Sequence, residues 1–254
     1  MNPSLISVLS LTIALAAACA SNEGATELPG PVPSDDEPGS PDPGAPDDAP
    51  EPGDEPVDEP NPDPTAACSG AASYRVSMSM TWDPSDVPNP HWSPLVGAVH
   101  RASAGLWELG ATASPGIEVM AETGSTGPLV AEVAELVASG DALASVVGPP
   151  IALSPGAATV DVELSPSHSQ VTLVSMLAPS PDWFVGVSGV ELCRDGEWVE
   201  GFVDLEVYDA GTDSGIGFTS ANADTVPAQP IALEPGFAPG GVPRLLGRMT
   251  FELL

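Results

Sequence analysis

The sequence predicts a mainly β protein, an antiparallel β-sandwich with one or two short helices, preceded by an acidic, proline-rich stalk. Three observations support this prediction: short runs in which apolar and polar residues alternate, turn residues between these runs, and a stretch ahead of them with almost no large apolar side chain. Alternation with a period of two places every second side chain on a buried face. Many short strands within about 185 residues are typical of a sandwich.

The chain begins with an apolar run, residues 5–18, that has the length of a secretory signal peptide and is short for a membrane-spanning helix. We therefore expect residues 1–18 to be removed and the chain to be exported. The end of this run, Leu15-Ala16-Ala17-Ala18-Cys19, resembles a bacterial lipobox, although alanine stands where a larger aliphatic residue is usual. We expect a lipid on Cys19 to anchor the protein at a bacterial cell surface or outer membrane. Cleavage without lipidation, which gives a secreted protein, is the alternative.

Residues 19–67 are expected to form a lipid-anchored, disordered linker. From residue 21 onward this stretch holds 13 prolines and 14 acids with no basic residue. Such a composition cannot bury a core, and its like charges extend the chain. The linker would lift a folded domain, residues 68–254, away from the surface.

The charge balance excludes several classes of partner. The chain has 36 acids against five basic residues, and its net charge is −31. All five bases are arginines: Arg75, Arg101, Arg194, Arg244 and Arg248. Nucleic acids bind through Lys and Arg, so they are excluded as partners, and an anionic membrane surface would repel the chain. Cations and basic partners fit this charge.

Apart from Cys19, the chain contains one pair of cysteines, Cys68 and Cys193. In an oxidising compartment we expect this pair to form a disulfide. Two free buried thiols are the alternative.

The domain is expected to begin near Cys68 with a strand at 74–80, in which apolar and polar residues alternate. Further strands are expected at 160–164, 171–177, 184–190, 203–207 and in a last segment that contains Leu245, Met249, Phe251 and Leu253. Residues 128–139 differ, because their apolar side chains recur at helical spacing between a leading proline and a following glycine. This segment is expected to be a short amphipathic helix.

Aromatic and histidine residues are expected to have structural roles. The tryptophans at 92, 107, 183 and 198 are more often core anchors than ligand platforms. His91 and His100 are nine residues apart without a third ligand at metal spacing, which does not suit zinc.

Two acidic loops flank a run of β-type sequence. One contains Asp182 within Ser-Pro-Asp-Trp, and the other contains Asp209 and Asp213 within Asp-Ala-Gly-Thr-Asp-Ser-Gly. Calcium takes about six to eight oxygen ligands from carboxylates, backbone carbonyls and water. Loops of Asp, Gly and Ser can supply them, because glycine lets the backbone turn. Ordinary Asp-rich turns give the same spacing. Spacing alone therefore does not distinguish a calcium site from such turns.

An enzyme is not expected. Asp213-Ser214-Gly215 has the Asp-Ser-Gly of aspartic proteases, but that chemistry requires two such carboxylates and the motif occurs once. The chain has no Gly-x-Ser-x-Gly around residues 186–189. An EF-hand is excluded because Ser214 occupies the position that requires glycine.

The order of several short motifs resembles the spondin domain family, found in F-spondin and mindin of animal extracellular matrix and in scattered bacterial proteins. The motifs are Tyr74 at the first strand, His91-Trp92-Ser93 followed by His100, Leu106-Trp107-Glu108-Leu109-Gly110, Ala113-Ser114-Pro115-Gly116, Pro179-Ser180-Pro181-Asp182-Trp183, Leu192-Cys193 and Asp209-Ala210-Gly211-Thr212-Asp213-Ser214-Gly215. The resemblance covers roughly residues 68–254.

This resemblance implies a sandwich similar to C2 domains, no catalysis, and one calcium ion held by Asp182, Asp209 and Asp213. It also implies a Cys68–Cys193 disulfide. Animal members have additional cysteines, reeler or thrombospondin repeats, and integrin or matrix partners that do not transfer here.

We therefore expect a calcium-dependent adhesion or extracellular-matrix binding module whose protein, matrix or glycan partner is not identified by the sequence. A surface module for a small ligand or glycan, with a structural calcium, is the alternative.

Overall fold

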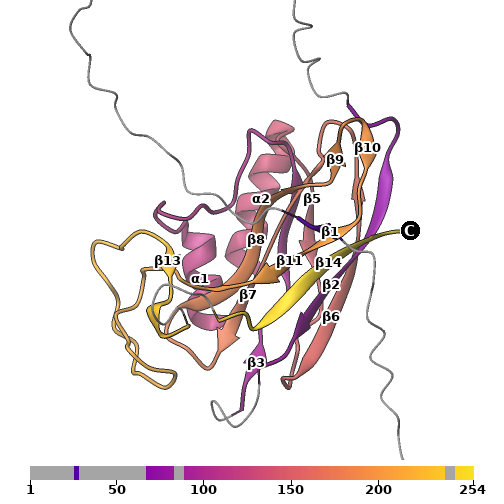
Figure 1. The fold of residues 1–254 in the computed structure, drawn as a ribbon. Coiled ribbons are helices and arrows are strands. Elements are labelled where there is room, and N and C mark those ends of the chain that lie inside the picture. The colour runs from indigo at the N-terminus through magenta and orange to yellow at the C-terminus, as the bar shows by residue number, and fades with distance from the viewer. Residues whose placement is uncertain (1–25, 29–66, 83–88, 238–243) are drawn as a thin grey trace, which may run out of the picture.

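The structure is a computed structural model that describes residues 26–28, 67–82, 89–237 and 244–254. Two β-sheets pack face to face, and two helices cover the outer face of one sheet (Figure 1). One buried cluster of side chains lies between the sheets, and a second lies between the helices and the sheet they cover. The predicted sandwich is confirmed, with the helices as a third layer.

The first sheet has five strands in the order β1-β11-β14-β2-β6. Their bounds are Thr26–Glu27 for β1, Gly201–Leu205 for β11, Gly247–Leu253 for β14, Ala72–Met80 for β2 and Gly156–Leu164 for β6. Neighbouring strands are antiparallel except β1, which runs parallel to β11. Strand β2 alternates between fully buried and more exposed residues, as its sequence predicts.

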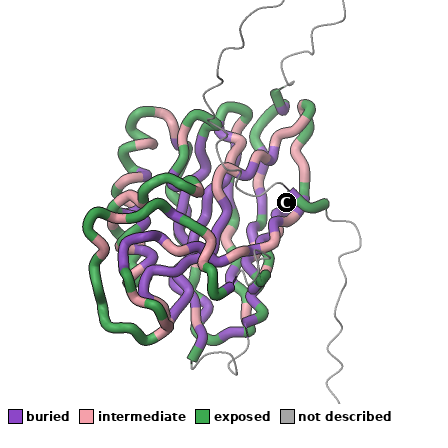
Figure 2. Tube along the Cα trace, turned by 60° about the vertical axis from the view of Figure 1, so that its left-hand side comes forward, coloured by how far each residue is buried: buried purple, intermediate pink, exposed green. Residues whose placement is uncertain are grey.

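The second sheet has the order β13-β12-β8-β7-β4-β5, and β3 pairs with β7. Their bounds are Ala232–Leu233 for β13, Val207–Asp209 for β12, Trp183–Glu191 for β8, Gln170–Ala178 for β7, Val96–His100 for β4, Ala142–Val147 for β5 and His91–Trp92 for β3. In β7 every residue after the first is buried, because helices cover one face and the other sheet covers the opposite face. Figure 2 shows these buried runs at the centre and exposed residues along the loops.

Helices α1, Pro115–Thr123, and α2, Gly127–Ser139, form the outer layer. The predicted helix at 128–139 corresponds to α2. Helix α1 starts at a Pro-Gly pair that reads as a turn, but Ser114 caps it by accepting a hydrogen bond from the Ile117 N–H at 3.2 Å. Glu132 of α2 accepts a second one from the Gly116 N–H at 2.6 Å. Helix α2 therefore helps to cap the start of α1.

The tryptophans anchor the core, as predicted for Trp92, Trp107 and Trp183, which are all buried. Trp198 is partly buried and packs edge-on against Tyr74. Trp82 lies between Trp92 and two phenylalanines, Phe218 and Phe237, with ring centroids 5.5 to 6.0 Å apart. This aromatic cluster joins the two sheets at one end of the sandwich.

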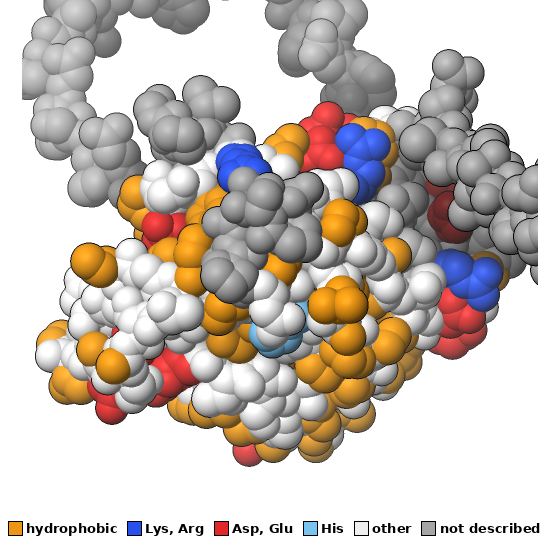
Figure 3. Space-filling model, turned by 90° about the horizontal axis from the view of Figure 1, so that it is seen from below, with side chains coloured by type: hydrophobic (Ala, Val, Ile, Leu, Met, Phe, Trp, Pro, Cys, Tyr) orange, Lys and Arg blue, Asp and Glu red, His pale blue; other side chains and the backbone are white. Residues whose placement is uncertain are grey.

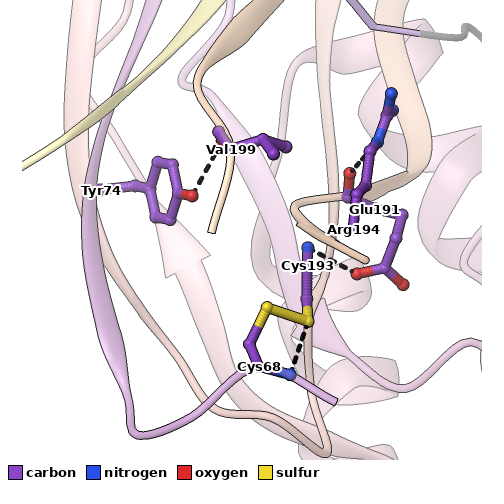
Figure 4. Close-up of a disulfide and its surroundings, with 6 residues drawn as sticks. All are labelled: Cys68, Tyr74, Glu191, Cys193, Arg194 and Val199. Carbon is purple, nitrogen blue, oxygen red and sulfur yellow. Dashed lines mark hydrogen bonds between the residues drawn. A yellow bond between two sulfur atoms is a disulfide. The ribbon is translucent and has the colours of Figure 1, made fainter. Parts of the chain in front are cut away.

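The Cys68–Cys193 disulfide is present, with the two Cα atoms 5.7 Å apart (Figure 4). It joins the segment before β2 to β9, Cys193–Arg194, which forms a small hairpin with β10, Glu197–Trp198. Close by, the Tyr74 hydroxyl donates a hydrogen bond to the Val199 carbonyl at 2.8 Å. The disulfide therefore fixes the start of the first sheet to the chain that leaves the second.

The expected signal peptide, the lipidation site Cys19 and most of the expected linker lie outside the described residues. Thr26, Glu27 and Leu28 are an exception, because the structure places them against β11 rather than in an unstructured tract. Within the described part of the chain, no helix is long and apolar enough to cross a membrane.

His100 is a buried histidine with both ring nitrogens in hydrogen bonds. Nδ1 lies 2.8 Å from the Arg101 carbonyl, so it carries the proton, and Nε2 lies 2.7 Å from the Thr172 hydroxyl. That hydroxyl donates to Nε2 and accepts from the Gly189 N–H at 2.8 Å. Burial lowers the pKa of His100, although the hydrogen bond to the Arg101 carbonyl partly offsets this. The histidine is therefore a neutral structural residue.

This arrangement predicts a loss of stability in mild acid. Because the folded-state pKa of His100 lies below its ordinary value, the unfolded chain binds the proton first, and stability falls as pH drops below about 6.5. The slope from His100 can be at most about 1.4 kcal/mol per pH unit in that window. Urea unfolding between pH 7.5 and 5.5 should therefore be less pH-dependent in His100→Gln than in the wild type. Equal slopes would contradict this role.

Candidate metal site at the ends of β8 and β12

The two acidic loops meet where β8 begins and β12 ends. Asp182 directly precedes β8, and Asp209 is the last residue of β12. These strands pair antiparallel with Asp209 opposite Trp183. The Ala210 N–H also donates to the Asp182 carbonyl at 3.2 Å. Strand pairing therefore joins loops that are about thirty residues apart in sequence.

Asp182 is the centre of this junction. Its side chain is 0% exposed. Oδ2 accepts hydrogen bonds from the N–H of Thr212 at 2.8 Å, the N–H of Asp213 at 3.0 Å and the Thr212 hydroxyl at 3.3 Å. Oδ1 is buried and has no hydrogen-bond partner among the described residues. A buried carboxylate oxygen without a partner is unfavourable unless a proton or a cation lies beside it.

The electrostatic environment of Asp182 adds to this cost. Burial raises the pKa of its carboxyl, the Asp213 N–H lowers it, and the charge of Asp209 raises it again. Burial also raises the pKa of Asp209, which the Gly211 N–H lowers and the charge of Glu234 raises. The Trp183 indole lowers the Asp209 pKa further, although its N–H falls short of hydrogen-bond geometry. At both carboxylates, burial and neighbouring acids therefore outweigh the hydrogen bonds that favour the charged form.

Asp209 and Asp213 also behave as turn residues. Each accepts a hydrogen bond from the N–H two residues ahead, Asp209 from Gly211 at 2.7 Å and Asp213 from Gly215 at 2.6 Å. The second oxygen of Asp213 accepts from the Ala223 N–H at 3.0 Å. The interpretation of these residues as Asp-rich turns thus accounts for the contacts of Asp209 and Asp213. It does not account for the buried, partnerless oxygen of Asp182.

Two further acids lie near the junction and were not predicted. Glu122, in the last turn of α1, has a pKa raised by burial, lowered by the Thr212 hydroxyl, and raised by neighbouring acids that include Asp213. Glu234, just after β13, raises the pKa of Asp209. Both are distant in sequence from the two loops, and no local motif marks them.

The described residues contain no group of three His, Cys, Asp or Glu side chains close enough together to hold a metal ion. The three predicted aspartates are thus neighbours around one junction rather than a closed cage. The partnerless oxygen of Asp182 and the surrounding acids fit a cation. The remaining ligands would have to come from backbone carbonyls or water, as is common for calcium.

The fold and the site define a helix-covered β-sandwich domain with paired acidic loops at one end of a sheet. The model of the family described as Spondin_N matches residues 72–234, and the chain therefore belongs to this family. The expected family resemblance is confirmed.

Individual relatives agree with this assignment. The chain is similar to Spondin-2 of Rattus norvegicus, 35% identical over 169 residues, which are 61% of this chain and 50% of the relative. It is also similar to Spondin-1 of Gallus gallus, 34% identical over 211 residues, which are 73% of this chain and 26% of the relative. The chain thus spans half or less of these relatives.

Gly211 is a point at which the loop geometry can be tested. Its φ is +74°, and an added Cβ would lie 2.3 Å from the Gln229 carbonyl oxygen. Gly70 has a similar φ of +73° but no atom within 4 Å of an added Cβ. Gly70→Ala should therefore cost about 1 kcal/mol from backbone conformation alone, and Gly211→Ala clearly more. Equal losses in thermal unfolding would show that the loop is not held as described.

Proposed function

We propose that this domain binds one calcium ion through Asp182, Asp209 and Asp213 and acts as a non-catalytic adhesion or extracellular-matrix binding module. The observation that carries the proposal is the fully buried Asp182, whose Oδ1 has no partner among the described residues. A cation beside this oxygen would offset the cost of its burial.

The chemistry of the junction favours calcium over softer metals. The groups around it are carboxylates, a hydroxyl and backbone amides, and the aspartates offer only oxygen ligands. Zinc and copper prefer imidazole and thiolate ligands, whereas calcium accepts six to eight oxygens in a flexible arrangement. Magnesium demands a more rigid octahedron, which is harder to build from two loops.

The proposed adhesive surface is the loop that Asp213 holds. Thr225 donates to the Thr212 carbonyl at 2.7 Å, so the chain between them closes on itself. Ile216 on this loop is 96% exposed, and Val226 just after it is 90% exposed. Large aliphatic side chains so exposed are candidate contacts for a partner. Figure 3 shows one face of the molecule, on which hydrophobic side chains are numerous and acids are scattered.

Calcium would order this loop through charge. Without a cation, the acids at the junction repel one another, which favours separation of the loop from β8. A bound cation would attract each of these acids. It would thereby hold the loop, and Ile216 on it, in a fixed position. We further propose that the module is exported, with Cys19 as its lipid anchor and no enzymatic activity.

A small-ligand or glycan site is the second candidate function. A pocket of about 340 Å³ is lined by four aromatic residues, Trp82, Trp183, Phe218 and Phe237, together with polar residues such as Glu234. It adjoins the proposed calcium site, because Trp183 follows Asp182 in the chain and Glu234 influences Asp209. Aromatic side chains near a bound ion suit glycan recognition.

Asp182→Asn tests the calcium site. The asparagine oxygen can keep the bonds from the Thr212 and Asp213 amides, while the buried charge is removed. In chelator, the variant should be at least as stable as the wild type. Calcium at one hundred times its Kd should stabilise the wild type by about 2.7 kcal/mol and the variant much less. Asp213→Asn should also lose the response. A normal calcium response in both variants, measured by calorimetry, would refute the assignment.

The adhesive surface predicts a different pair of effects. Ile216→Ser with Val226→Ser should reduce attachment of the immobilised domain to cells or matrix while leaving its calcium-dependent stabilisation intact. Leu153→Ser, at a residue 69% exposed on another loop, is the matched control and should attach normally. Attachment in wild type should disappear in chelator. Retention on a glycan array, with no attachment at all, would favour the second candidate.

A further inference from the structure

Strand β1 comes from the tract that the sequence predicts to be an unstructured linker. It pairs parallel to β11, with Thr26 opposite Gly201 and Glu27 opposite Phe202. The Leu28 N–H donates to the Phe202 carbonyl at 2.5 Å. Figure 1 shows this short indigo segment beside β11, at the edge of the five-stranded sheet.

Leu28 is an apolar anchor within this segment. It is 3% exposed and belongs to the cluster between the sheets. It is also the only leucine between Leu15 and Leu95, in a tract dominated by Pro, Asp and Glu. A single large aliphatic residue therefore reaches the core from a stretch that otherwise has little to bury.

Gly201 provides the space for this anchor. An added Cβ would lie 2.3 Å from the Thr26 carbonyl oxygen and 2.8 Å from Leu28 Cγ. All three nearest atoms belong to Thr26 and Leu28. The close approach of the docked segment is therefore what requires glycine at this position of β11.

Charge supports the same contact. The Arg248 guanidinium lies 3.6 Å above the Phe202 ring and forms an ion pair with Asp204 at 2.7 Å. Glu27 lies near enough for its negative charge to act on Arg248 as well. One of the five basic residues of the chain thus lies near the docked segment.

We propose that the edge of β11 is a docking surface for the chain's own residues Thr26–Leu28, so that the acidic tract after Leu28 is a closed loop attached to the domain at both ends. Cys19 is then seven residues from β1, which span at most about 25 Å. A lipid on Cys19 would hold the β11 edge close to the membrane, whereas an undocked linker would allow the domain to move away. This proposal does not depend on calcium binding.

Spin labels can measure the docking directly. In the full chain carrying Cys19→Ser, nitroxides are placed at Thr26→Cys and at Thr159→Cys on β6. Docked, these positions are separated by four strand spacings, roughly 20 Å, with a narrow distribution. If the segment is not docked, about 40 residues connect residue 26 to the domain. Their root-mean-square end-to-end distance is about 35 Å, so the distribution of label distances is broad.

Two variants and one control make the outcome decisive. Leu28→Asp removes the anchor and Gly201→Val fills its space, so both should broaden the distribution while the domain still unfolds cooperatively. Val57→Asp, also an aliphatic-to-aspartate change in this tract but outside the described residues, should leave the distance distribution narrow. A broad distribution in the unmutated segment, or a narrow one in both variants, would overturn the proposal. A third outcome would also overturn the proposal. If chains labelled only at residue 26 are mixed with chains labelled only at residue 159 and the short distance appears, the segment docks on a second copy of the chain.

Discussion

The antiparallel pairing of β7 and β8 is the constraint on which the rest of this structure depends. Helices pack on one side of this hairpin and the five-stranded sheet packs on the other, so both buried clusters include its side chains. The turn of the hairpin contains Asp182. A carboxylate at that point lies where two packed layers end, and the adjoining loop closes over it through the bonds from Thr212 and Asp213. The site is therefore a consequence of how the core is layered.

Regular patterns were predictable from the sequence because they repeat. The alternation of β2 and the helical spacing of α2 each extend over nine or more residues. The prediction of one or two short helices located only α2. Helix α1 was not located because Pro115-Gly116 resembles a turn, and only the cap from Ser114 and the contact with Glu132 make it a helix start. Strand β1 has two residues, so no periodicity marks it. Tertiary contacts decide both cases.

The candidate site was predictable to a similar extent. Paired acidic loops at strand ends identify Asp182, Asp209 and Asp213, and strand pairing does bring their loops together. Sequence spacing could not show that Asp182 is fully buried with one oxygen lacking a partner among the described residues. Nor could it indicate Glu122 or Glu234, which reach the junction from other elements. Burial and long-range proximity are properties of the packed chain, so they leave no local signal.

The disulfide also has a mechanical consequence for a domain that is held by its N-terminal side. Once Thr26–Leu28 has separated from β11, force entering at Cys68 passes through the covalent bond to Cys193, which directly follows β8 and Leu192. It therefore reaches the central hairpin without peeling β2 from its neighbours. The proposed adhesive loop follows β12, the strand paired with β8. Force between the N-terminal attachment and a partner on this loop would therefore pass through the disulfide, β8 and β12. Most of the first sheet would carry none of it.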